Sequence, residues 1–344
     1  MRHRILTSLF AATLLAFLGP LPSSADMPTA SPIDTIVFGS CIRGDAEQTF
    51  WKTLSNENPD LALFLGDNVY GDDESPDLAT LRAAYQMLEN EKGFQQLWAQ
   101  TTMLATWDDH DYGRNDGGAD YPLKRASEHV FETFWNYGPD SDVANRDGVY
   151  HARHFGPAGQ RVQVILLDTR FFRSRLTRKD WNDPTPGRYQ PNSDPSATML
   201  GSDQWAWLEK TLKEPADLRI LASSIQVIAE GHAWERWGNL PLERERLNET
   251  LSKASGTTLV ISGDRHRGAI YKKDIGANAP LIEMTSSSLN ASLPWGEPGP
   301  FRLGGMVGAN NYGTVRIDWP ARTVLLSLHG TSDGETLRSI EVDF

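Results

Sequence analysis

The sequence predicts an α/β fold. Short apolar runs of β type alternate with helical stretches along most of the chain, and the first three segments form a β-α-β pattern. A hydrophobic fraction of 39% over 344 residues is sufficient to bury a large core. Because no repeat, low-complexity tract or flexible linker follows residue 32, we expect one domain over residues 33–344.

Each predicted strand is a short apolar run bounded by polar or turn-forming residues. Strands are predicted at residues 35–38, 61–65, 103–107, 162–168, 220–228, 258–262, 281–284, 313–319, 323–328 and 338–344. Helices are predicted where the pattern is helical, at residues 45–57, 78–100, 125–137, 205–213 and 242–254. Residues 112–121 form a Gly-containing loop, and residues 170–195 form a long polar loop that we expect near a functional site.

The N-terminus has the pattern of a secretory signal peptide at residues 1–25. Arg2 and Arg4 form a basic start, the apolar run 5–18 follows, and small residues supply a cleavage site. The apolar run is too short to span a membrane comfortably. We therefore expect a periplasmic or secreted protein that begins with a short linker, 26–32, and has no transmembrane anchor after processing. A retained N-terminal anchor is the alternative.

Charge argues against a nucleic-acid-binding protein, and the cysteine content excludes an intramolecular disulfide. The formal net charge of −12 argues against a nucleic-acid binder that relies on a cationic surface. Since Cys41 is the only cysteine, an intramolecular disulfide is excluded, although exported proteins commonly use disulfides. The thiol needs another explanation, either as a small buried apolar group or as a functional one.

Chemically active side chains gather where predicted strands end. Cys41 follows the first strand, Asp67 and Tyr70 follow the second, the run 108–111 follows the third, and Asp264 and His266 follow the strand at 258–262. In α/β folds these strand ends are the usual place for ligands. Acids, imidazoles, a phenol and a thiol at one sheet edge need cations to offset their repulsion, so the pattern predicts metal binding. The mixed set suits a trivalent or borderline ion, and the additional carboxylates suit a hard divalent ion.

The order of these motifs resembles a known family. The sequences Gly66-Asp67-x-x-Tyr70, Asp109-His110-Asp111 and Gly263-Asp264-x-His266 resemble the motifs of calcineurin-like metallophosphoesterases, and Ser40-Cys41 narrows the match to the alkaline phosphatase D (PhoD-like) family. Supporting stretches lie at residues 167–170, 237–244, 285–288 and 311–313. The resemblance implies a four-layer αββα sandwich of two mixed β-sheets flanked by helices.

The resemblance also implies two metal ions. A ferric ion, Fe(3+), would be held by Cys41, Asp67, Tyr70 and His266. A second ion, typically Ca(2+) in this family but open to another divalent ion, would be held by Asp109 and Asp264, with Asp67 shared between the two. For a further side chain that lines the site, His232 is the candidate and Gln226 the alternative.

Catalytic roles follow from the same resemblance and from charge. Two cations can share a hydroxide that attacks phosphorus. His110 would protonate the leaving group or stabilise the transferring phosphate, and Asp111 would orient the imidazole. Arg43, Arg114 and Arg265 are candidates for binding the phosphate, and Arg114 is preferred because it follows the histidine on a Gly-rich loop.

The predicted function is an exported metal-dependent phosphoesterase, an alkaline phosphatase or phosphodiesterase acting on small or polymeric phosphate mono- or diesters. One alternative is a phospholipase-type phosphodiesterase using the same site. A cysteine hydrolase built on Cys41 is disfavoured because the surrounding acids would raise the pKa of the thiol. A non-catalytic secreted calcium-binding protein is disfavoured because no EF-hand signature is present.

Overall fold

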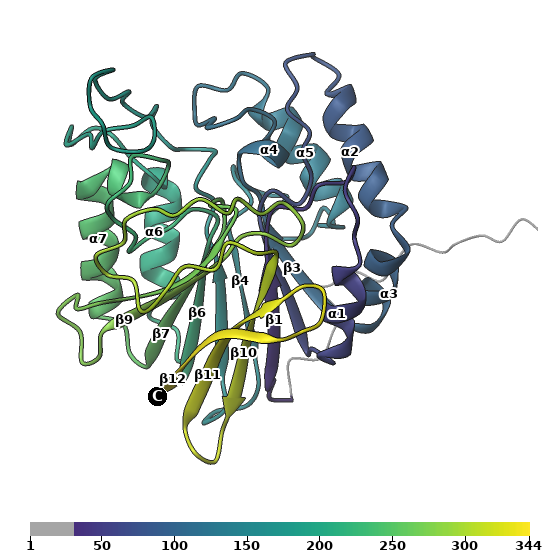
Figure 1. The fold of residues 1–344 in the computed structure, drawn as a ribbon, viewed down its shortest axis with the longest axis vertical. Helices are drawn as coiled ribbons and strands as arrows, with labels where there is room; N and C mark the ends of the chain where they lie inside the picture. The colour runs from purple at the N-terminus through teal and green to yellow at the C-terminus, as the bar shows by residue number, and fades with distance from the viewer. Residues whose placement is uncertain (1–30) are drawn as a thin grey trace, which may run out of the picture.

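The computed structural model describes residues 31–344. The predicted signal peptide at residues 1–25 lies outside the described residues, as does nearly all of the predicted linker. The described part of the chain contains two mixed six-stranded sheets (Figure 1). This arrangement confirms the predicted α/β fold with two mixed sheets.

The first sheet combines N-terminal and C-terminal strands. Its spatial order is β12 (Thr336–Asp343), β11 (Thr323–Gly330), β10 (Asn311–Asp318), β1 (Thr35–Gly39), β2 (Leu61–Leu65) and β3 (Thr102–Thr106). The second sheet is built from the middle of the chain. Its spatial order is β4 (His151–Phe155), β5 (Val162–Leu166), β6 (Leu218–Ser223), β7 (Thr257–Ser262), β9 (Leu281–Ser286) and β8 (Gly268–Lys273).

The helices fall into two groups that lie on opposite sides of the sheets in Figure 1. The first group consists of α1 (Phe50–Asn56), α2 (Ala79–Glu89), α3 (Lys92–Gln100), α4 (Asp109–Tyr112) and α5 (Lys124–Phe134). The second group consists of α6 (Gly201–Thr211) and α7 (Pro241–Ser252), with the short 3₁₀ helix η2 (Trp237–Asn239) before α7.

Alternation along the strands produces the four layers. In β1, Ile36 and Phe38 belong to the apolar core that both sheets share, whereas Val37 packs with the residues of the first helix group. In β5, Val164 faces the shared core, and Ile165 packs with residues of α6 and α7. Because both faces of each strand are buried, these strands are nearly continuous apolar runs.

The structure corrects several predicted boundaries. The helix expected at 45–57 begins only at Phe50, and the strand expected at 220–228 ends at Ser223. The helix expected at 78–100 divides into α2 and α3, because Glu91 has an extended backbone and its carboxylate accepts the Gly93 amide hydrogen at 3.1 Å. Strands β4 and β8 were not predicted; β4 carries polar side chains in its centre and so lacks an apolar run.

Within residues 31–344, we find no helix whose length and apolarity would suffice to cross a lipid bilayer.

The shared core should dominate stability. Leu63 lies in that core with 1% of its surface exposed, whereas Leu325 on β11 is 38% exposed. We expect Leu63→Ala to lower the free energy of unfolding by about 2–5 kcal/mol because it leaves a cavity. Leu325→Ala, the matched control, should cost no more than about 1 kcal/mol. Denaturant unfolding measures both variants, and equal losses would contradict the assignment of the core.

Candidate metal centre and active site

The predicted metal ligands lie in the turns that follow four strands. Cys41 follows β1, Asp67 follows β2, Asp109 begins α4 after β3, and Asp264 and His266 follow β7. Strands β1, β2 and β3 are parallel, so their carboxyl ends lie at one edge of the first sheet. Side-chain contacts across the two sheets then bring the turn after β7 to the same place.

These turns have an uncommon backbone conformation. Cys41, Asp67, Asp264 and His266 have φ values of 62°, 48°, 67° and 54°. The left-handed region costs a residue other than glycine about 1–3 kcal/mol, and such residues cluster at functional sites. Gly66 precedes Asp67 with φ 97°, and a Cβ atom there would lie 2.4 Å from the Cβ of Asp108. Only glycine therefore fits before Asp67 in this turn.

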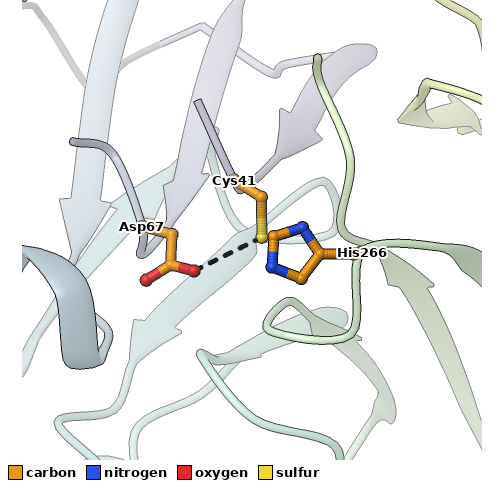
Figure 2. A group of neighbouring side chains, drawn as sticks. All are labelled: Cys41, Asp67 and His266. Atoms are coloured by element: carbon orange, nitrogen blue, oxygen red, sulfur yellow. Dashed lines mark hydrogen bonds between the residues drawn. The ribbon is translucent and has the colours of Figure 1, made fainter. Parts of the chain in front are cut away.

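A thiol, a carboxylate, a phenol and an imidazole converge. The Cys41 Sγ atom lies 3.5 Å from Oδ2 of Asp67, and possible ligand atoms of Cys41, Asp67 and His266 lie within 4.8 Å of one another (Figure 2). The Tyr70 hydroxyl lies 3.2 Å from Oδ2 of Asp67 and 3.4 Å from Nε2 of His266. Nδ1 of His266 lies 2.5 Å from the Ala291 carbonyl oxygen, so Nδ1 donates there and Nε2 keeps its lone pair toward the cluster.

Burial makes this cluster unfavourable without a cation. Burial and the Asp67 carboxylate raise the pKa of both the Cys41 thiol and the Tyr70 phenol well above their usual values. Burial also raises the pKa of Asp67 and of Asp264. Oδ2 of Asp264 is buried and accepts no hydrogen bond, although Nη1 of Arg265 lies 3.8 Å from it. A buried carboxylate oxygen without a hydrogen bond, beside soft and hard ligand atoms, fits a metal ion, which favours the deprotonated form of the acidic groups.

Carboxylates extend the site beyond this cluster. Possible ligand atoms of Asp67, Asp109 and His110 lie within 4.8 Å of one another, and so do those of Asp109, Asp116 and Glu235. Asp67 is common to the first set and to the cluster with Cys41, while Asp109 is common to the two carboxylate-rich sets. The all-carboxylate set suits a hard divalent cation. Asp116 and Glu235 were not predicted, because neither follows a predicted strand.

A buried ion-pair network supports the carboxylates. Nε of Arg170 donates to Oδ1 of Asp108 at 2.7 Å, and Nη1 of Arg170 lies 2.6 Å from Oε2 of Glu235. Arg173 also contacts Glu235, at 2.9 Å. The side chains of Arg170 and Asp108 are fully buried. Removing one member of such a pair leaves an uncompensated charge, so the network fixes Glu235 and the residue before Asp109 in place.

His110 stands beside the cluster with a partner of its own. Its Nδ1 lies 2.5 Å from Oδ2 of Asp72, and its ring centroid lies 4.3 Å from that of Tyr70. Burial alone would lower the pKa of His110, but Asp109, Asp67 and Asp72 raise it to about 11 in the metal-free protein. These carboxylates favour the protonated imidazole, which is the form that can donate a proton or stabilise an anion.

Several of these groups face one open cavity of about 420 Å³, whereas Cys41 and Tyr70 are not part of its lining. Asp67, Asp109, His110, Asp264 and His266 line it. Its size falls in the usual range for small-molecule sites.

Comparisons with known proteins agree with this geometry. A family model described as PhoD-like phosphatase matches residues 36–302. The chain belongs to the PhoD-like phosphatase family. It is thus a metal-dependent phosphoric ester hydrolase, as the resemblance implied. No curated protein matched the sequence in a direct search.

Several proteins of known structure have a fold similar to that of this PhoD-like phosphatase. A structure of PhoD aligns with a TM-score of 0.73 and 20% identity, over 92% of this chain and 71% of that one. Purple acid phosphatase PPD1 from yellow lupin seeds aligns with a TM-score of 0.61 and 14% identity, over 92% and 55%. GAP50, the anchor in the inner membrane complex of Plasmodium, aligns with a TM-score of 0.58 and 11% identity, over 91% and 90%.

Asp111, expected to orient the His110 imidazole, has its hydrogen bonds elsewhere in this PhoD-like phosphatase. Asp111 is fully buried and accepts backbone amide hydrogens from Asp108 at 2.5 Å and from Asp67 and Asn68 at 3.2 Å. It therefore holds the turn after β2 against the start of α4. It is Asp72 whose carboxylate contacts the His110 ring. No sequence motif identifies Asp72, because the path of the loop after β2 brings it to the ring.

Arg114, the preferred candidate for binding phosphate, also lies elsewhere. Its Nε donates to Oε1 of Glu74 at 3.0 Å, and Arg114 does not line the cavity. Arg43 is exposed and paired with Asp45. Arg265 does line the cavity, together with Arg267 and Arg188, which sequence analysis missed.

His232 lies outside the cavity lining. It is buried, and its Nε2 lies 3.2 Å from Oε1 of Gln226, which is also buried and outside the lining. Burial and nearby arginines lower the pKa of His232 to about 2, so it is a neutral histidine within the protein interior.

Asp72 should matter through His110. Asp72→Asn removes the anionic partner of Nδ1, so we expect the pKa of His110 in the metal-free protein to fall and kcat of the loaded enzyme to drop about 10- to 100-fold. NMR titration of the imidazole and steady-state kinetics measure these effects. The control is Asp77→Asn, an exposed acid of the same loop. If both variants keep the wild-type pKa and kcat, Asp72 does not position the imidazole.

Proposed function

We propose that this chain is an exported alkaline phosphoesterase that hydrolyses phosphate mono- and diesters with a ferric ion and calcium. The observation that supports it most directly is the meeting of Cys41, Asp67, Tyr70 and His266. Few protein functions other than metal binding account for a buried thiol, phenol, carboxylate and imidazole in contact.

In this proposal, the ferric ion is held by Cys41, Asp67, Tyr70 and His266. A thiolate sulfur and a phenolate oxygen are strong anionic ligands for a trivalent ion. Asp109 and Asp264 would hold calcium, with the Asp67 carboxylate shared between the two sites, because hard carboxylate oxygens suit this ion. When bound, the ions supply Lewis-acid activation of water and of the phosphoryl oxygens.

The protein's own groups complete the chemistry. His110 donates its proton to the leaving oxygen or neutralises charge on the transferring phosphate, and Asp72 holds the ring through Nδ1, so Nε2 is the donating atom. Asp111 acts indirectly, because its carboxylate accepts the Asp67 amide hydrogen and so fixes the turn that carries Asp67. The Arg170 pair with Asp108 keeps the ligand turn from shifting.

Export is the remaining part of the proposal. The basic start, apolar run and small-residue cleavage site within residues 1–25 support a secreted or periplasmic location. An oxidising compartment is also compatible with a protein that has one cysteine and uses it as a ligand.

Cysteine catalysis is a poorer account of the same residues. The Cys41 side chain is fully buried, and burial together with the Asp67 carboxylate raises the pKa of its thiol. A nucleophilic cysteine needs the opposite, an exposed thiol with a lowered pKa.

The proposal predicts metal-dependent turnover. Purified protein should hydrolyse 4-nitrophenyl phosphate and bis(4-nitrophenyl) phosphate, chelation should abolish both activities, and added calcium should restore activity lost from the more labile site. Asp109→Asn should lower kcat/KM by at least about 100-fold because it weakens a metal ligand. The control is Asp140→Asn, an exposed acid with no such neighbours. Full activity after exhaustive chelation, or in Asp109→Asn, would refute it.

A further inference from the structure

Apolar side chains surround one side of the active-site cavity. Trp234, Leu293 and Trp295 line the same cavity as Asp67 and Asp109. Trp295 is 70% exposed and Leu293 is 39% exposed. Single exposed apolar residues are common on protein surfaces, but a group of them around one polar cavity indicates a binding surface.

The backbone holds this wall next to the ligand turn. The Leu293 amide donates to the His266 carbonyl oxygen at 2.8 Å, and Nη1 of Arg267 donates to the Trp295 carbonyl oxygen at 2.6 Å. Arg267 is itself paired with buried Glu297 at 3.3 Å. The two exposed apolar side chains therefore stand on a fixed segment beside a proposed metal ligand, which lowers the entropic cost of binding there.

The third member of the wall lies between two arginines. The Arg188 guanidinium lies 5.7 Å from the Trp234 ring centroid, and the Arg265 guanidinium lies 5.5 Å from it. Such cation–π contacts restrain the indole at the place where it lines the cavity. Trp234 is partly buried, so its position is fixed more firmly than that of Trp295.

The arginines of the cavity are already engaged. Arg188 lies 3.5 Å from Asp116, Arg265 lies 2.8 Å from Glu297, and Arg267 shares Glu297. Among residues 31–344, every arginine that lines the cavity thus has a carboxylate partner. This pairing offsets part of the positive charge that faces the phosphate. A monoester would bring a second negative charge there, whereas a diester carries a single charge and a second substituent.

We propose that Trp234, Leu293 and Trp295 form a subsite for a ring-sized apolar substituent of a phosphodiester, which lies beside the phosphate while that phosphate reacts. The inference rests on the proposed phosphoesterase function and narrows its substrate class. Contact with the subsite removes apolar surface of the substituent from water, and about 55 Å² of such surface is sufficient for roughly a tenfold effect on kcat/KM.

The test compares two diesters with the same leaving group, phenyl 4-nitrophenyl phosphate and methyl 4-nitrophenyl phosphate. The ratio of their kcat/KM values is measured in wild type and variants, so that the intrinsic reactivity of each ester cancels. We expect Trp295→Ala to lower the phenyl-to-methyl ratio about tenfold. The matched control is Trp181→Ala, since Trp181 is 94% exposed and lies outside the cavity lining. This control should keep the wild-type ratio.

A binding measurement separates this inference from the proposed function. Calorimetry gives the Kd of diphenyl phosphate and of dimethyl phosphate for the same three proteins. If the wild type hydrolyses neither nitrophenyl diester, the proposed function fails, and the Kd ratio alone decides the subsite. The subsite is supported if Trp295→Ala binds diphenyl phosphate more weakly than the wild type while Trp181→Ala binds it as the wild type does. An unchanged ratio in Trp295→Ala, or an equal fall in Trp181→Ala, overturns it.

Discussion

The structure depends on one electrostatic constraint, the burial of several anionic donors at the meeting point of two sheets. Cys41, Asp67, Tyr70 and Asp264 all have pKa values raised by burial, so without a cation their charged forms are disfavoured. A bound cation reverses that balance and converts a local cost into binding free energy. The surrounding fold serves to hold the donors close enough for this to happen.

Holding them there requires local strain and a rigid support. Cys41, Asp67, Asp264 and His266 adopt the left-handed backbone region. Gly66 permits the approach of the turn after β2 to the turn after β3. The buried ion pair of Arg170 and Asp108 adds a desolvation cost that apolar residues in the same place would not have. These features lower the stability of the folded protein when no metal is bound, as active-site geometry commonly does. The apolar core between the sheets compensates for this loss of stability.

The fold by itself does not define the chemistry. Proteins as different as a purple acid phosphatase and an anchor of a membrane complex share this architecture at low sequence identity. What distinguishes the present chain is its donor set and the family match over residues 36–302. The function is therefore argued from the side chains and the family.

The sequence predicts the part of the site that is local to strand ends. Cys41 and Asp67 follow neighbouring parallel strands of one sheet, so their convergence could be expected from the topology. His266 follows β7 of the second sheet, and the packing of the two sheets brings it to them. Asp72 and Glu235 could not be predicted, because a loop and a distant ion-pair network bring them in. Sequence order also misdirected the choice of Arg114, whose side chain turns away to Glu74.

The same limit applies to the fold. Buried strands such as β2 and β7 are apolar on both faces and are easily recognised, whereas β4 has partly exposed polar residues and no apolar period. Tertiary pairing with β5, and not local propensity, makes β4 a strand.

The central claim is that the turns after β1, β2 and β7 hold a ferric ion, with Cys41, the only cysteine of the chain, as one of its ligands. Elemental analysis and visible absorption of purified wild-type protein and of folded Cys41→Ala test it most directly. The account predicts about one iron per wild-type chain with a visible charge-transfer band, and loss of both in the variant while its circular dichroism is unchanged. A colourless wild type without iron, or a variant with full iron content, would contradict it.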